Sequence, residues 1–246
     1  MSLEGNNSLG MPQAFEAFHT TEYISFVSQV GLLNPGQMKV LLSQTSELFQ
    51  ASPLSTAILT AGKGKIASLE GDFHLASKYL EDALLLALEE HNKAEDQETE
   101  NVLAYVHYEA GLLQRYLYAP QQAKLHFHQA IELTNSSKLR SLLEFQFELL
   151  AVESGKKTKL NRLARMVDQF KKKKMISMYV IGLNRLGSLL YKQGDYNEAE
   201  AQLNSALQLA KEKKFQYLVW NIQNDIGLLL HKQQKFKASV EYFESF

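Results

Sequence analysis

The sequence of 246 residues contains no cysteine, only four prolines and a single tryptophan, and its formal net charge is −1. The absence of cysteine excludes disulfides, thiolate metal sites and a cysteine nucleophile, and it fits the cytoplasmic location that we expect. The near-zero net charge argues against nucleic-acid binding along the whole chain. No apolar run approaches the roughly 18 residues that a membrane-spanning helix needs, so no membrane span is expected.

Motifs for catalysis and metal binding are also lacking. His126 and His128 lie two residues apart, so on a helix they would point in different directions and could not share a metal ion. The stretch Gly62-Lys63-Gly64-Lys65 lacks the full pattern of a phosphate-binding loop and follows no strand. We therefore expect no enzymatic activity, no metal site and no cofactor.

Three of the four prolines stand where a helix would begin. Proline is favoured at the first helical position, where its missing N–H costs no hydrogen bond. The dipeptides concerned are Asn34-Pro35, Ser52-Pro53 and Ala119-Pro120. Elsewhere apolar residues recur with the period of a helix, as between Leu203 and Ala210, and strand-like alternation of useful length is missing. The sequence predicts an all-α fold.

A pattern of glycine, aromatic and small residues recurs along the chain, as expected for a stacked helical array. It is clearest in the segment NRLGSLLYKQGDYNEAEAQLNSAL, residues 184–207. Glycines at corresponding places are Gly64, Gly111, Gly187 and Gly227, and the long interval after Gly111 predicts a degenerate repeat there. Because glycine and alanine carry little or no side chain, we expect them to let two antiparallel helices approach closely. Each helix pair would then cover the open apolar face of the preceding pair.

This pattern resembles the tetratricopeptide repeat, in the long-period form of kinesin light chain and bacterial peptide-sensing regulators. The resemblance implies a right-handed α-α superhelix of antiparallel helix pairs, although the usual tryptophan of the first helix is missing. We expect a disordered segment at 1–20, N-terminal helices at 21–52 and a repeat array at 53–246. Its repeats would lie near 57–90, 104–136, 141–170 (degenerate), 180–212 and 220–246. The last repeat stops midway along its second helix, which predicts that it is truncated.

In this family the first helix of each pair lines a groove that binds peptides, which implies a scaffold for a protein or peptide partner. The candidate binding residues are Lys65, Tyr108, Arg115, Asn184, Tyr191, Lys192, Asn221, Asn224 and Lys232. Asn184 and Asn224 occupy the same repeat position, where an amide can bond to any peptide backbone. Cations beside aromatic rings favour an acidic peptide with an apolar anchor. The alternative is that the polar residues face solvent and the tyrosines pack between helices.

Two further functions stay open. The abrupt end of the last repeat suggests a ligand-sensing regulatory segment of a larger signalling or transcription-regulator protein. Self-association would use the terminal repeat faces near Trp220 and residues 236–246.

Two charged segments stand out. Residues 155–174 carry nine basic residues and one acid, a composition that suits nucleic acid, an anionic membrane or an acidic partner. Their apolar residues form a helical stripe, however, so we interpret the charges as the solvated face of a helix and regard nucleic-acid binding as the weaker alternative. The acidic segment 89–100 is expected to form an exposed loop.

Overall fold

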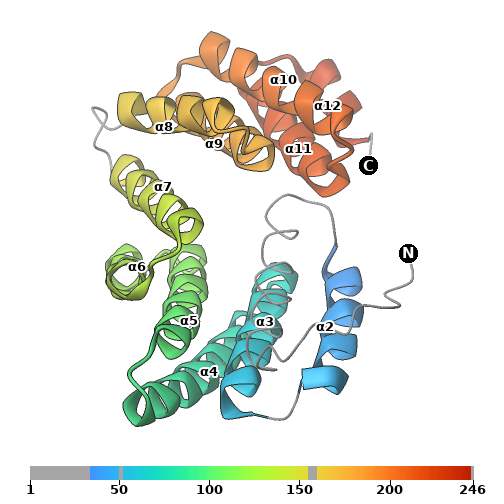
Figure 1. Ribbon diagram of the computed structural model, residues 1–246. Coiled ribbons are helices and arrows are strands. Elements are labelled where there is room, and N and C mark those ends of the chain that lie inside the picture. Colours follow the sequence, from blue (N-terminus) through green and yellow to red (C-terminus); the bar gives the residue numbers. More distant parts are fainter. Residues whose placement is uncertain (1–33, 50–51, 155–159, 245–246) are drawn as a thin grey trace. The chain divides into compact units, whose positions relative to one another are not determined.

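The computed structural model describes residues 34–49, 52–154 and 160–244 (Figure 1). Within these ranges the chain forms eleven helices and no strand, which confirms the predicted all-α class. None of the helices in the described ranges is long and apolar enough to cross a bilayer. The expected disordered segment 1–20 and the stretch 21–33 of the expected N-terminal helices lie outside the described residues.

The chain divides into two compact units, which we describe separately. The first, Pro35–Arg140, holds α2 (Pro35–Phe49), α3 (Pro53–Glu70), α4 (Phe73–Lys93), α5 (Gln97–Tyr116) and α6 (Pro120–Leu133). α7 (Ser137–Glu153) begins at the end of this unit and lies mostly in the second. The second unit continues with α8 (Leu160–Lys172), α9 (Ile176–Gln193), α10 (Tyr196–Glu212), α11 (Gln216–Lys232) and α12 (Phe236–Phe243). Helices α2, α3 and α6 begin at the three predicted prolines.

Consecutive helices form pairs in both units. α3 packs on α4 and α5 on α6, and in the second unit α9 packs on α10 and α11 on α12. The first helices of neighbouring pairs also touch, since α5 contacts α3 and α11 contacts α9. In the segment expected to be degenerate, the Phe145 ring of α7 meets the Phe170 ring of α8 edge to face, with centroids 5.4 Å apart. The predicted organisation into helix pairs is therefore present in each unit.

Six turns between helices share one backbone arrangement. In each, a residue just past the helix end adopts a left-handed conformation, with φ from 56° to 90°. The next amide then donates to the carbonyl five residues back, as Asp195 N does to Leu190 O at 3.0 Å. This is the Schellman arrangement, which supplies partners for the last carbonyls of a helix. The left-handed residues are Gly71, Tyr118, Lys174, Gly194, Lys214 and Gln234. A recurring turn explains why a recurring sequence pattern produces similar helix pairs.

The repeated glycines allow the two helices of a pair to approach closely. A Cβ atom added to Gly187 would lie 2.7 Å from Leu203 Cγ and 3.2 Å from the carbonyl oxygen of Ala199. Equivalent contacts occur at Gly64, Gly111 and Gly227. The predicted packing role of these glycines is confirmed.

Replacing Gly111 by alanine is expected to lower the free energy of unfolding by about 1–3 kcal/mol, because overpacking forces neighbours to move. The new Cβ would lie 2.4 Å from Cε1 of Phe127, whose side chain is fully buried. Alanine favours a helix over glycine by about 1 kcal/mol, and the clash outweighs this gain. Chemical denaturation followed by circular dichroism would measure the difference. In a Phe127→Leu background the same substitution should cost clearly less, and an unchanged stability of Gly111→Ala alone would contradict the expected clash.

The structure corrects the expectation for the acidic segment and agrees with the interpretation of the basic segment. The acidic segment 89–100 is not a loop, which corrects the expectation: α4 continues to Lys93, α5 begins at Gln97, and only 94–96 lie outside helices. Asp96 begins α5 by accepting a hydrogen bond from the Thr99 amide at 2.9 Å, so part of the acidic charge serves as a helix cap. The described part of the basic segment forms α8, which buries an apolar stripe as predicted and keeps most of its charges in solvent.

Candidate functional site

A polar cluster joins the first helices of the last two pairs. Ser188 of α9 donates a hydrogen bond from its hydroxyl to Oδ2 of Asp225 on α11 at 2.6 Å. The side chain of Asn184, one turn earlier on α9, also bonds to Asp225. Asn184 is buried, and its Oδ1 atom has no hydrogen-bond partner. These contacts fix how α9 and α11 lie against one another, and they leave one buried amide oxygen unused.

The surroundings of the Asp225 carboxyl shift its pKa in opposite directions. Burial raises its pKa, whereas the Ser188 bond, the charges of Arg185 and Lys192 and the Asn184 bond lower it, and the net pKa is raised. Two cations of α9 therefore lie close to this one acid of α11. Because the cations outnumber the acid, the cluster has an excess of positive charge.

Beside this cluster, α9 and α11 present a row of side chains to solvent. On α11, Asn221, Asn224 and Lys232 are exposed, and Leu228 keeps 43% of its surface accessible. On α9, Lys192 is exposed and Arg185 is half-buried. We call this set the α9/α11 surface: Arg185, Ser188, Lys192, Asn221, Asn224, Leu228 and Lys232. It combines amides, cations and an apolar side chain on two helices that touch.

The predicted binding residues of the first unit lie differently. Tyr108 is 2% exposed, and its ring packs 6.2 Å from that of Phe127. Lys65, expected to add charge to a groove wall, is buried with its Nζ 3.1 Å from Oε2 of Glu109. Arg115 is half-buried. Tyr108 and Lys65 are thus placed in the interior, and we leave both out of the α9/α11 surface.

In the second unit the exposure of the predicted residues also varies. Asn184 is buried by packing between α9 and α11, unlike Asn224, which holds the same repeat position and is exposed. Tyr191 is half-buried, with its ring centroid 6.4 Å from that of Tyr196. The sequence interpretation missed Arg185 and Asp225. Their positions differ by the forty-residue repeat and carry opposite charges, and this signal could have identified them.

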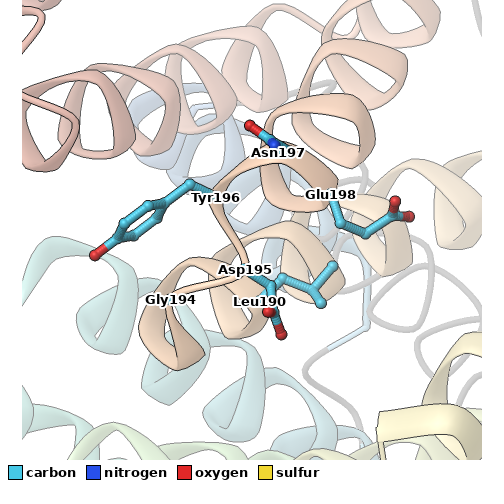
Figure 2. Close-up of a pocket in the computed structure, with 6 residues that line it drawn as sticks. All are labelled: Leu190, Gly194, Asp195, Tyr196, Asn197 and Glu198. Atoms are coloured by element: carbon cyan, nitrogen blue, oxygen red, sulfur yellow. The ribbon is translucent and has the colours of Figure 1, made fainter.

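A hollow of about 510 Å³ lies at the turn between α9 and α10. Its lining residues are Leu190, Gly194, Asp195, Tyr196, Asn197 and Glu198. Figure 2 shows the Tyr196 ring and the Glu198 carboxylate pointing in different directions, so they do not converge on a common point. None of the predicted binding residues lines this hollow, and we assign it no function.

The structure brings His126 of α6 beside a histidine of the neighbouring helix α5. Nδ1 of His107 on α5 lies 3.1 Å from Nδ1 of His126 on α6. Burial, and then the neighbouring His126, lower the pKa of His107 to about 4, and burial lowers that of His126. Within the described ranges, no group of three or more histidine, cysteine, aspartate or glutamate side chains could hold a metal ion.

Comparison with known proteins agrees with the fold of paired helices. Residues 179–245, which contain the α9/α11 surface, match the family model of the tetratricopeptide repeat. None of the curated proteins compared with the sequence matches it.

Among solved structures, NprR in complex with its cognate peptide NprX is similar, with a TM-score of 0.61 and 15% sequence identity. This match covers 96% of the present chain and 67% of the NprR chain. The apo form of the quorum sensor NprR from B. thuringiensis matches with a TM-score of 0.54 and 14% identity, over 96% and 65% of the two chains. The chain therefore spans about two thirds of the NprR chains, whose fold it shares. It is an all-α helical-repeat protein, and its residues 179–245 match the family model of the tetratricopeptide repeat.

Proposed function

We propose that the protein is a non-catalytic scaffold that binds a peptide or protein segment on the α9/α11 surface. The repeat family matches these helices, and NprR, which shares the fold, has been solved with a bound peptide. The observation that carries the proposal is the exposure of two asparagines beside cations on helices that touch. We also propose a repeat array over residues 53–246 and a cytoplasmic location, which the absence of cysteine favours.

The asparagines suit an extended chain. Asn221 and Asn224 lie one turn apart on α11 and both are exposed. Each amide offers donors and an acceptor, so it can bond the N–H and C=O groups of a peptide without selecting its side chains. Binding would therefore depend on backbone contacts at these two positions.

The charges and the apolar side chain of the surface favour one class of peptide. Arg185, Lys192 and Lys232 contribute three positive charges, and Asp225 is the one acid among them. Leu228 supplies an accessible apolar contact. We therefore propose an acidic peptide with an apolar anchor as the partner.

Selection from a phage-displayed random heptapeptide library would test the proposal. The wild-type chain is expected to enrich peptides that are rich in aspartate and glutamate. The double substitution Asn221→Ala/Asn224→Ala should weaken binding of a selected peptide about thirtyfold, since each lost hydrogen bond contributes about 1 kcal/mol. Fluorescence anisotropy of the synthetic peptide would measure the affinity.

A matched control is available on α10. Asn197 and Asn204 are also exposed, so Asn197→Ala/Asn204→Ala removes two amides from another helix and should leave the affinity unchanged. If this control loses binding while the α11 variant retains it, recognition lies at α10 or in the hollow that Asn197 lines. If the library yields no peptide at all, peptide binding itself is refuted.

A second candidate is a ligand-sensing regulatory segment of a larger protein. The bond between Ser188 and Asp225 favours it, because a ligand that changed this contact would change the angle between neighbouring pairs. Self-association through the terminal pair is a further proposal. It is supported by large apolar side chains of α11 and α12 that face solvent, among them Trp220 and Phe236.

A further inference from the structure

One side of α5 is covered where the same side of α11 is open. Leu112 of α5 and Leu228 of α11 each follow the repeat glycine of their helix directly, yet Leu112 is 6% exposed and Leu228 is 43% exposed. One turn earlier, Tyr108 of α5 is 2% exposed, whereas Asn224 at the same repeat position of α11 is exposed. Both positions are therefore shielded from water on α5 and accessible on α11.

The helices that pack on α5 and α11 do not account for this difference. Among the described helices, α5 packs against α3, α4 and α6, and α11 packs in the same way against α9, α10 and α12. A following pair shields only one of the two positions. On α9, which contacts the following α11, Asn184 at the Tyr108 position is buried. Ser188 at the Leu112 position stays half-buried, so the cover over Leu112 comes from another part of the chain or from another molecule.

The covered area continues onto α3. Lys65 directly follows the repeat glycine of α3, so it holds the position of Leu112, and its side chain is 4% exposed. Its Nζ lies 3.1 Å from Oε2 of Glu109 on α5, whose side chain is 1% exposed. Pairing explains why the two charges tolerate burial, but it does not supply the atoms that shield them from water. We call Lys65, Tyr108, Glu109 and Leu112 the α3/α5 face, and its burial on two neighbouring helices indicates a cover that spans both.

We infer that residues 1–33 of the same chain lie on the α3/α5 face. They are joined directly to Asn34, which precedes α2, and α2 packs on α3. A chain of this length reaches about 110 Å when extended, so a face on α3 and α5 is within its range. The other stretches outside the described residues are at most five residues long, which is too short to cover two helices.

The composition of residues 1–33 suits this face. They include the aromatic residues Phe15, Phe18, Tyr23 and Phe26, and aromatic side chains bury a large area against apolar and aromatic neighbours. They contain three acids and neither lysine nor arginine, so they bring no cation that would compete for Glu109. The inference goes beyond the proposed function, because the α9/α11 surface takes its partner from another molecule and the α3/α5 face takes it from the same chain.

Disulfide trapping in the full chain tests the inference, and the absence of native cysteine makes the result unambiguous. Leu112→Cys is combined in turn with a cysteine at each aromatic position, namely Phe15→Cys, Phe18→Cys, Tyr23→Cys and Phe26→Cys. A disulfide needs two Cα atoms within about 7 Å of one another. Mild oxidation should therefore join at least one of the four pairs within a single chain, as detected by mass spectrometry of the oxidised protein.

Lys63→Cys is the matched control for chance encounters. Lys63 is exposed and stands two residues before Lys65 on α3, so it points away from the α3/α5 face while the same segment is tethered nearby. With the same four positions it should form disulfides about tenfold more slowly or not at all. Equal rates for Lys63→Cys and Leu112→Cys would refute the inference, as would the absence of any disulfide with Leu112→Cys. Disulfides that join two chains would assign the cover to a second copy and refute the intrachain contact.

The reactivity of a single thiol tests whether the aromatic residues hold the cover in place. Leu112→Cys should react with dithiobis(nitrobenzoate) about tenfold faster, or more, when the four aromatic residues are replaced by serine. Val106→Cys places a thiol in the core that α5 shares with α3 and α4, and it should react slowly in both backgrounds. An unchanged rate for Leu112→Cys refutes the role of the aromatic residues. If the serine variant unfolds and exposes Val106→Cys as well, the disulfide comparison decides the inference without it.

Discussion

Replacing Lys65 by methionine is expected to lower the free energy of unfolding by about 3–5 kcal/mol, the usual cost of breaking a buried ion pair. Nζ of Lys65 on α3 lies 3.1 Å from Oε2 of Glu109 on α5, and the side chains are 4% and 1% exposed. Methionine fills much of the same space but carries no charge. The Glu109 carboxylate would then be a buried charge without its cation, which accounts for the loss.

The protonation of Lys65 sets the pH range of this contribution. Burial lowers the pKa of Lys65, but the charges of Glu109 and Tyr116 and the bond to Glu109 raise it, and the net pKa lies above its usual value of 10.5. A raised pKa means that the folded state holds the proton more tightly than the unfolded state does. The stabilisation that the Lys65 charge contributes is therefore fully present below pH 10.5. It is lost as the pH rises through the pKa that Lys65 has in the folded state.

Urea denaturation at neutral pH, followed by circular dichroism, would measure the effect of Lys65→Met. Lys63→Met is the matched control, because Lys63 lies on the same helix with its side chain exposed, and such a change should alter stability by less than about 0.5 kcal/mol. The double variant Lys65→Met/Glu109→Leu removes both charges and should recover most of the lost stability. A loss below about 1 kcal/mol for Lys65→Met would show that the pair contributes far less than buried pairs usually do.

Lowering the pH from 6.5 to 4 is expected to destabilise the fold by about 3 kcal/mol through His107 alone, since each pKa unit corresponds to about 1.4 kcal/mol. The pKa of His107 is lowered from 6.5 to about 4, so the folded state favours the neutral ring. The stabilisation is complete above pH 6.5 and is lost as the pH falls toward 4. Protonation would also break the contact with His126, in which one ring nitrogen must accept the hydrogen bond.

The free energy of unfolding of the wild type is compared with that of His107→Gln between pH 6.5 and 4. Carboxylates contribute to acid denaturation in both proteins, so the difference between the two isolates the histidine. That difference should shrink by about 3 kcal/mol between pH 6.5 and 4. His74→Gln removes an exposed imidazole and serves as the control. Parallel pH profiles for wild type and His107→Gln would contradict the assigned role.

Much of the fold could be predicted because its determinants are local. Proline fixes the first turn of a helix, and α2, α3 and α6 begin where the prolines predicted. Glycine removes a steric barrier at one position, and Gly187 contacts Leu203, sixteen residues later in the same helix pair. These signals act within a single pair, so one sequence suffices to detect them.

The burial of individual site residues depends on neighbouring pairs and could not be predicted in the same way. All residues of α5 from 102 to 113 are buried, although Tyr105, His107 and Glu109 are among them. Tyr108 was expected in a groove because the resemblance places first-helix positions there, and polar residues in a helix usually indicate a solvent-facing side. The partner of His107 is nineteen residues away on another helix, a separation unrelated to the period of a single helix.

The bond between Ser188 and Asp225 also bears on how the repeats unfold. In a repeat array, stability is approximately the sum of the intrinsic stability of each repeat and a term for each interface between neighbours. The intrinsic terms decide how much of the chain is folded, whereas the interface terms decide whether neighbouring repeats fold together. The Ser188–Asp225 bond joins residues 37 apart across such an interface, so it belongs to the second kind. It adds to the coupling between the last two described pairs, so that the opening of either pair removes a stabilising contact from the other.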